Sequence, residues 1–156
     1  MENTNVINAC RKHIQVHAAN CSGFVKAVAK DFNIDLAGQA NQIFMTLRTR
    51  PGVWQYGVGW SAARLAADDA LHGKYLVIAA SYAPGRGNHG HVAIVTGSNT
   101  AGDVVVYGGV LNHPEKASRG IRIQSKCWAA FKLTAPYVAA EPPEFFGVPV
   151  PIPFIA

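Results

Sequence analysis

The alternation of hydrophobic and polar residues divides the chain into helices first and strands afterwards. In the first half, apolar residues recur at the three- and four-residue spacing of a buried helix face. In the second half, short β-branched runs stand between turns rich in glycine, asparagine and proline. This order predicts an α+β fold with N-terminal helices packed on an antiparallel β-sheet. No repeat or boundary is visible, so we expect a single domain over residues 1–156.

Four helices are expected. They are residues 5–18, a segment capped by Asn20 and ended by Asn33, Ala40–Leu47, and a segment capped by Ser61 that runs to Leu71 and stops at Gly73. The glycine-rich stretch Trp54–Trp60 is expected to be a loop.

Up to five strands are expected in the second half. They are Tyr75–Ser81, His91–Thr96, Val104–Tyr107, Ile121–Ile123 and Ala135–Val138. Turn residues at Pro84–Asn88 and Ser98–Gly102 connect the first three. The proline-rich tail, 141–156, is expected to be neither helix nor central strand. We expect an extended strap over the core, with an apolar surface for a partner as the alternative.

Composition narrows the class of protein. Hydrophobic residues make up 49% of the chain and charged residues 15%, which is ample for one core and excludes extensive disorder. No signal peptide or membrane span is apparent, so we expect synthesis in the cytoplasm and another route for any action elsewhere. The net charge of +5 favours an anionic partner. Because Lys and Arg are scattered, nucleic acid is a weaker choice than an acidic polymer such as peptidoglycan, and a merely solvated surface is the alternative.

Cys21 is the main candidate for chemistry. It follows the cap Asn20 and opens a buried stripe, so its thiol would lie at the positive end of a helix dipole, which favours the thiolate. Its backbone N–H could donate to an oxyanion, and the small Ser22 and Gly23 would leave room for a substrate carbonyl. An inert buried cysteine is the alternative.

His91 is the candidate base, because it begins a β-branched strand after Gly90, a residue that permits close approach. His89 competes for this role from the loop, and a structural histidine is the other alternative. The third, orienting residue stays open. The neighbouring strand offers Tyr107 as a tentative choice, with Asn112 and His113 beyond it, and a backbone carbonyl or water would also serve.

Two other groups invite interpretation. His13 and His17 have the i, i+4 spacing of a metal pair, but no third ligand is near in sequence, so a partly buried helix face is favoured. Cys10 and Cys127 could form a disulfide in an oxidising compartment, which would leave Cys21 free.

Several stretches together resemble papain-like peptidoglycan amidases of the NlpC type, and more specifically the type VI secretion amidase effectors. They are Val6–Cys10, Asn20–Val25, Gly38–Asn41, Gly73–Ala79 and Gly90–Val95, in this order over roughly residues 5–110. The tail has no counterpart. The resemblance implies a papain-like fold in which Cys21 is the nucleophile and His91 the base, without metal or cofactor.

The resemblance also implies the substrate and the setting. The substrate would be a peptidoglycan stem amide next to meso-diaminopimelate, either γ-D-glutamyl–diaminopimelate or the diaminopimelate–D-alanine cross-link. The enzyme would be a monomeric antibacterial toxin that the type VI system delivers to the target-cell periplasm, and a cognate immunity protein would occlude its cleft. The alternatives are a housekeeping or phage-type cell-wall endopeptidase and a non-catalytic wall-binding module. A permuted acyltransferase is disfavoured, because its histidine precedes its cysteine.

Overall fold

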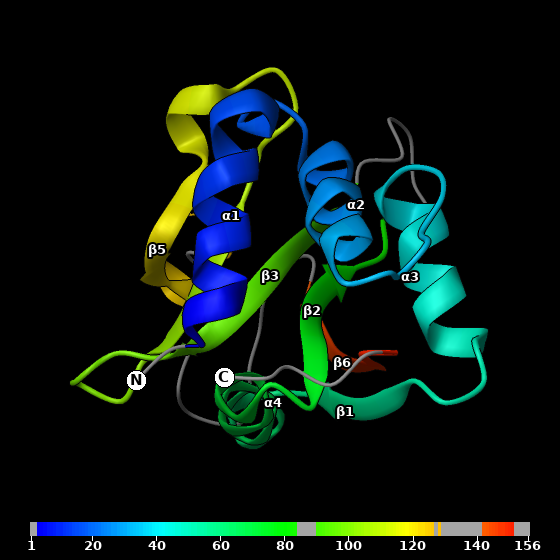
Figure 1. Ribbon diagram of the computed structural model, residues 1–156. Helices are drawn as coiled ribbons and strands as arrows, with labels where there is room; N and C mark the ends of the chain where they lie inside the picture. Colours follow the sequence, from blue (N-terminus) through cyan, green and yellow to red (C-terminus); the bar gives the residue numbers. More distant parts are fainter. Residues whose placement is uncertain (1–2, 84–89, 127, 129–141, 152–156) are drawn as a thin grey trace.

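The computed structural model describes residues 3–83, 90–126, 128 and 142–151 (Figure 1). Its helices are α1 (Thr4–His17), α2 (Cys21–Asp31), α3 (Ala40–Thr49) and α4 (Trp60–His72), with short 3₁₀ turns at Pro114–Lys116 and Ile123–Ser125. Its strands are β1 (Trp54–Val58), β2 (Tyr75–Ser81), β3 (His91–Ser98), β4 (Val104–Gly108), β5 (Ser118–Arg122) and β6 (Glu144–Pro149). They form one antiparallel sheet in the order β1-β6-β2-β3-β4-β5. The predicted α+β class is confirmed.

The sheet separates two hydrophobic cores. One face packs against α1, α2 and α3, and the other packs against α4, which lies apart from these three helices (Figure 1). Along β3, Val92 and Ile94 face the three-helix side, whereas Ala93 and Val95 face α4. This alternation follows from the two-residue period of a strand. It fixes on which face each side chain near the candidate site lies.

The helix-ending signals act as the sequence predicts. Asn33 has φ 60° just after α2, and Gly73 ends α4 in the left-handed region with φ 73°. The stripe of α2 is buried throughout, from Cys21 to Phe32. One cap is wrong, because α4 begins at Trp60 after Gly59 and Ser61 lies inside the helix.

The stretch Trp54–Trp60 is a second correction, since its first five residues form β1 instead of a loop. Among the described strands β1 is at the edge of the sheet, and its partner β6 lies some ninety residues away in the chain. A bulge between Gln55 and Gly57 and positive φ angles at Gly57 and Gly59 break its alternation. No periodic signal therefore marked it as a strand.

The tail is a third correction. β6 lies between β1 and β2, so the tail does supply a central strand. The prolines bracket the strand: Pro142 and Pro143 precede it, Pro149 ends it, and Pro151 follows it. The proline-free centre, with Phe145 and Phe146 fully buried, can therefore pair on both sides.

The remaining strand and turn predictions fall into two groups. Tyr75–Ser81 is confirmed, and β3, β4 and β5 contain or overlap the other expected strands within the described part of the chain. Asn99 organises the predicted turn, since its Oδ1 accepts from the N–H groups of Ala101 and Asp103. The connection Pro84–Asn88 and the segment Ala135–Val138 lie outside the described residues.

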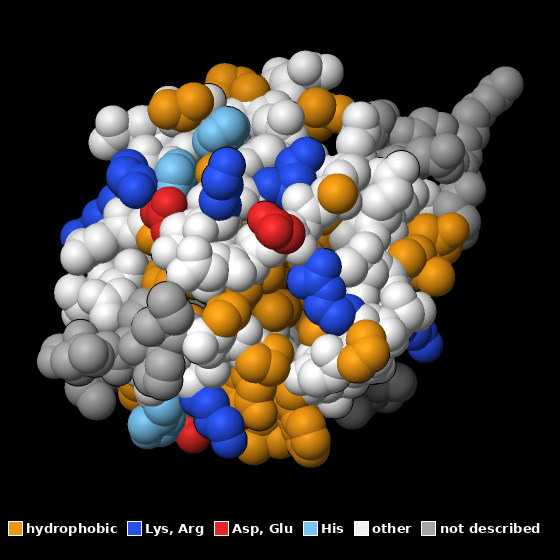
Figure 2. Space-filling view, turned by 45° about the vertical axis from the view of Figure 1, so that its right-hand side comes forward, with side chains coloured by type: hydrophobic (Ala, Val, Ile, Leu, Met, Phe, Trp, Pro, Cys, Tyr) orange, Lys and Arg blue, Asp and Glu red, His pale blue; other side chains and the backbone are white. Residues whose placement is uncertain are grey.

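Two further properties of the described residues concern the surface charge and the length of the helices. On the face shown in Figure 2, Lys and Arg side chains are scattered rather than gathered into one basic patch. Among the described residues, no helix has both the length and the apolar character needed to cross a bilayer.

Candidate active site

The first turn of α2 is built around Asn20. Its Oδ1 accepts from the Gly23 N–H at 2.9 Å and from the Ser22 hydroxyl at 3.0 Å, which satisfies one of the free donors of the helix start. A Cβ at Gly23 would lie 3.0 Å from Asn20 Cγ and 3.2 Å from His17 Nδ1. A larger residue at position 23 would therefore crowd the cap. Of the two small residues expected to leave room for a substrate, Ser22 lines the pocket at Cys21 and Gly23 is not among its described lining residues.

The turn between α1 and α2 is bound to the chain that follows β4. The Val110 N–H donates to the Ala18 carbonyl at 2.9 Å, and the Asn112 N–H donates to the Ala19 carbonyl at 3.0 Å. A Cβ at Gly109 would collide with the His17 carbonyl. The glycine after β4 thus allows the turn that carries Asn20 and Cys21 to lie directly against the sheet.

Cys21 reaches the beginning of β3 at this place. β4 ends at Gly108, which lies against Ala93, so the first residues of β3 extend beyond it. The Val92 N–H hydrogen-bonds to the Cys21 sulfur. Gly90 lines the same pocket as Cys21. The structure therefore brings the thiol next to the backbone of segment 90–92. The His91 side chain shares the two-residue alternation of Ala93 and Val95, so it lies on the α4 face with Trp128, whereas Cys21 belongs to the core on the three-helix face. Among the described residues, no hydrogen bond or ion pair joins the imidazole to the Cys21 sulfur.

Asn41, at the start of α3, binds the end of β2 at Ala83 and lies close against Gly90. Its Nδ2 donates to the Ala83 carbonyl at 3.0 Å, and its Oδ1 accepts from the Ala83 N–H at 3.1 Å. A Cβ at Gly90 would collide with the same Oδ1 and with the Ser81 carbonyl. Close approach to Gly90 was expected, and the groups that use it are Asn41 and the β2 backbone.

His91 packs edge-to-face against Trp128, with ring centroids 4.8 Å apart. Burial lowers the pKa of His91 to about 4, so the imidazole is neutral at neutral pH. Ser81 is its direct partner on β2, which places the two side chains on the same face. The Ser81 hydroxyl is fully buried and makes no hydrogen bond to any residue that the structure describes.

Tyr107, the tentative third residue, does not point toward His91. Its hydroxyl and ring lie against Gly120 of β5, on the side of β4 away from β3. This placement argues against an orienting role. His113, also considered, pairs with Glu115 at 2.9 Å on the surface. His89 lies outside the described residues.

The protonation of Cys21 differs from the sequence-based expectation. Burial raises the pKa of the thiol, although hydrogen bonds from the N–H groups of Val92, Ser22 and Cys21 itself lower it in part. Desolvation therefore outweighs the helix terminus, and the resting side chain is a thiol instead of a thiolate.

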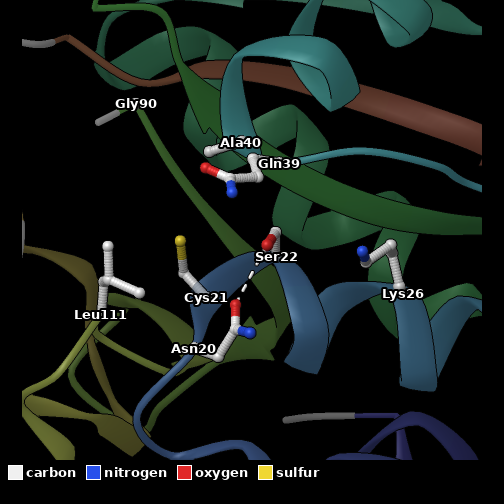
Figure 3. A pocket seen from close by; sticks show the side chains of 8 residues that line it. All are labelled: Asn20, Cys21, Ser22, Lys26, Gln39, Ala40, Gly90 and Leu111. Atoms are coloured by element: carbon white, nitrogen blue, oxygen red, sulfur yellow. Dashed lines mark hydrogen bonds between the residues drawn. The ribbon is translucent and has the colours of Figure 1, made fainter. Parts of the chain in front are cut away.

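The thiol opens into a pocket of about 170 Å³ between the first turns of α2 and α3 (Figure 3). The Cys21 sulfur points into this space, with Leu111 on one side and Ser22 on the other. The described lining residues are Asn20, Cys21, Ser22, Lys26, Gln39, Ala40, Gly90 and Leu111.

The other candidate groups lie away from this pocket. His13 Nε2 pairs with Asp31 Oδ2 at 2.9 Å, and the His13 and His17 rings are 6.4 Å apart. Within the described residues no group of three His, Cys, Asp or Glu side chains could hold a metal ion. The pairing of Cys10 with Cys127 involves a residue outside the described ones.

Sequence reasoning missed the residues that support the site: Asn41, Ser81, Lys26 and Trp128. Asn41 lies within Gly38–Asn41, one of the stretches that carry the family resemblance, but the sequence assigned it no role. Ser81 was visible as a polar residue at the end of an otherwise apolar strand. Trp128 carries no local signal that relates it to His91.

Comparison of the sequence with protein-family models and with curated proteins gave no match.

Proposed function

We propose that this protein is a cysteine amidase that cleaves a peptide-stem amide of peptidoglycan, with a papain-like, NlpC-type arrangement of its site. The observation that carries the proposal is the Cys21 sulfur at the start of a buried helix, hydrogen-bonded by the amide of the residue after His91. A cysteine next to a strand end that carries a histidine supports acyl transfer through a thioester, a reaction in which the imidazole has to turn from Trp128 toward the sulfur.

The reaction begins as Cys21 Sγ attacks the carbonyl carbon of the amide and His91 takes the thiol proton. The Cys21 N–H donates to the resulting oxyanion. His91 then gives the proton to the leaving amine, the C–N bond breaks and a thioester remains. Water attacks the thioester with His91 as base, which releases the acid and restores the thiol. Ser81 is the described side chain best placed to orient the imidazole, as the cross-strand partner of His91.

The setting is proposed from the resemblance stated above. The enzyme acts as an antibacterial effector that the type VI system delivers to the periplasm of a rival cell. A cognate immunity protein occludes the pocket at Cys21. The net charge of +5 supports association with the anionic cell wall.

Digestion of Gram-negative peptidoglycan tests the activity. Wild type is expected to release stem fragments whose masses identify the bond, whereas Cys21→Ala and His91→Ala release none. Cys10→Ala serves as the thiol control and keeps the wild-type profile, and Ser81→Ala is expected to cleave more slowly. Identical fragment profiles from wild type and Cys21→Ala would refute the proposed enzyme. The remaining candidate would then be a wall-binding module, and co-sedimentation of the protein with the same peptidoglycan would detect it.

A further inference from the structure

The described residues that line the pocket at Cys21 carry one positive charge and no negative charge. Among the described residues that line it, Asn20, Ser22 and Gln39 are neutral polar residues, and Lys26 is the one charged side chain. No Asp or Glu is found among these residues. Figure 3 shows the Lys26 amine directed toward the pocket from one end, beyond Ser22.

Lys26 has no counter-charge within the described part of the chain. No hydrogen bond or ion pair joins it to a described residue, whereas Lys12 on the preceding helix pairs with Asp31 at 3.0 Å. Lys26 is also partly buried, so its amine loses some of its water without gaining a partner in return. An anion that enters the pocket would supply that partner.

The spacing on α2 indicates where such an anion would sit. Ser22 and Lys26 are four residues apart and share a helix face, which runs along the pocket away from Cys21. Lys26 follows Cys21 by five positions, a rise of about 7.5 Å along the helix axis. A carboxylate on the atom next to the scissile carbonyl would stay close to the sulfur. A carboxylate several bonds away could reach the amine.

We infer that Lys26 binds a free carboxylate of the substrate, several bonds from the amide that Cys21 attacks. The inference rests on the proposed function and sharpens it, because it makes a free carboxylate part of what the enzyme recognises. Stem peptides carry such groups on D-glutamate and diaminopimelate. Stems in which that carboxylate is amidated are then poor substrates.

Kinetics on synthetic stem tetrapeptides test the inference. The peptides are L-Ala-γ-D-Glu-meso-diaminopimelate-D-Ala and two derivatives, one with the D-glutamate α-carboxylate and one with the side-chain-terminal diaminopimelate carboxylate converted to carboxamide. For wild type, one amidation is expected to raise KM about tenfold, as for loss of a charge-assisted hydrogen bond. Lys26→Met is expected to raise KM for the free peptide by the same factor, with kcat within about twofold, and to lose the discrimination. Lys30→Met, an exposed lysine on the same helix, is the control and behaves as wild type.

The outcomes separate the two proposals. If Lys26→Met cleaves with wild-type KM, or still discriminates against the amidated peptide, the inference is wrong and the amidase proposal stands. If wild type cleaves none of the peptides, calorimetry with Cys21→Ala and with Cys21→Ala/Lys26→Met decides between them. Weaker binding of the free peptide by the double variant supports the carboxylate site alone, and equal or absent binding overturns both.

Discussion

At the residue scale, burial drives both candidate catalytic groups toward their neutral forms. It raises the pKa of the Cys21 thiol and lowers the pKa of His91 to about 4. In the proposed reaction, a neutral thiol and a neutral imidazole favour proton transfer during the attack over a preformed ion pair. A thiol held in its neutral form reacts slowly with oxidants and alkylating reagents, since the thiolate is the reactive form of cysteine.

Alkylation by iodoacetamide should report the raised pKa of Cys21. The rate, followed on the Cys21 peptide by mass spectrometry, is expected to rise with a midpoint above that of N-acetylcysteine measured in parallel. The reason is desolvation of the thiolate, which exceeds the effect of the N–H groups around the sulfur. A midpoint below that of N-acetylcysteine would show that the helix terminus prevails.

His91 should make stability depend on pH. Between pH 6.5 and about 4 the unfolded chain binds a proton at this position and the folded chain does not. The free energy of unfolding therefore falls as the pH is lowered through this window, by on the order of 3 kcal/mol in total. Urea denaturation of wild type and His91→Gln measures the difference, with His72→Gln as an exposed control. Parallel pH profiles for wild type and His91→Gln would contradict the buried, neutral histidine.

At the element scale, the candidate site depends on contacts between helices, strands and turns rather than on any single motif. The turn between α1 and α2 lies against the chain after β4, and Asn41 of α3 holds the end of β2 beside Gly90. The thiol and the histidine are thus set by two separate junctions. A change at either junction should move one partner without removing any catalytic atom.

Gly109→Ala is the direct test of the first junction. The added Cβ collides with the His17 carbonyl and should push the start of α2 away from β3, lowering kcat/KM for the stem peptide by about tenfold or more. Gly102→Ala is the control, since Gly102 has φ +84° and open space around it, so the alanine strains a distant turn alone. If the two variants lose stability and activity in equal proportion, the junction has no specific role in placing Cys21.

The same junctions mark the limit of prediction from sequence. The stripe from Cys21 to Phe32 and the β-branched run after His91 are local patterns, and both elements were predicted. Gly109 and Asn41 have meaning only through contacts with residues far away in the chain, so no spacing reveals them. Tyr107 was considered for the same reason: sequence placed it on the neighbouring strand but could not show that its hydroxyl faces β5.

At the scale of the whole molecule, the C-terminal segment completes the sheet by supplying β6. β6 pairs with β1 on one side and β2 on the other, joining the last described strand to elements from the first half of the chain. The prolines hid this role, because their position around the strand matters more than their number. The result is a sheet with helices on both faces, whose centre supports β3 and therefore His91.

The central claim is that Cys21 carries the acyl group during amide cleavage. The measurement is a rapid acid quench of wild type with the stem tetrapeptide, followed by mass analysis of the intact protein and of the Cys21 peptide. The account predicts an adduct equal in mass to the acyl fragment of the substrate, bound at Cys21 and absent from Cys21→Ala. Cleavage that proceeds without such an adduct and at the same rate in Cys21→Ala would contradict it.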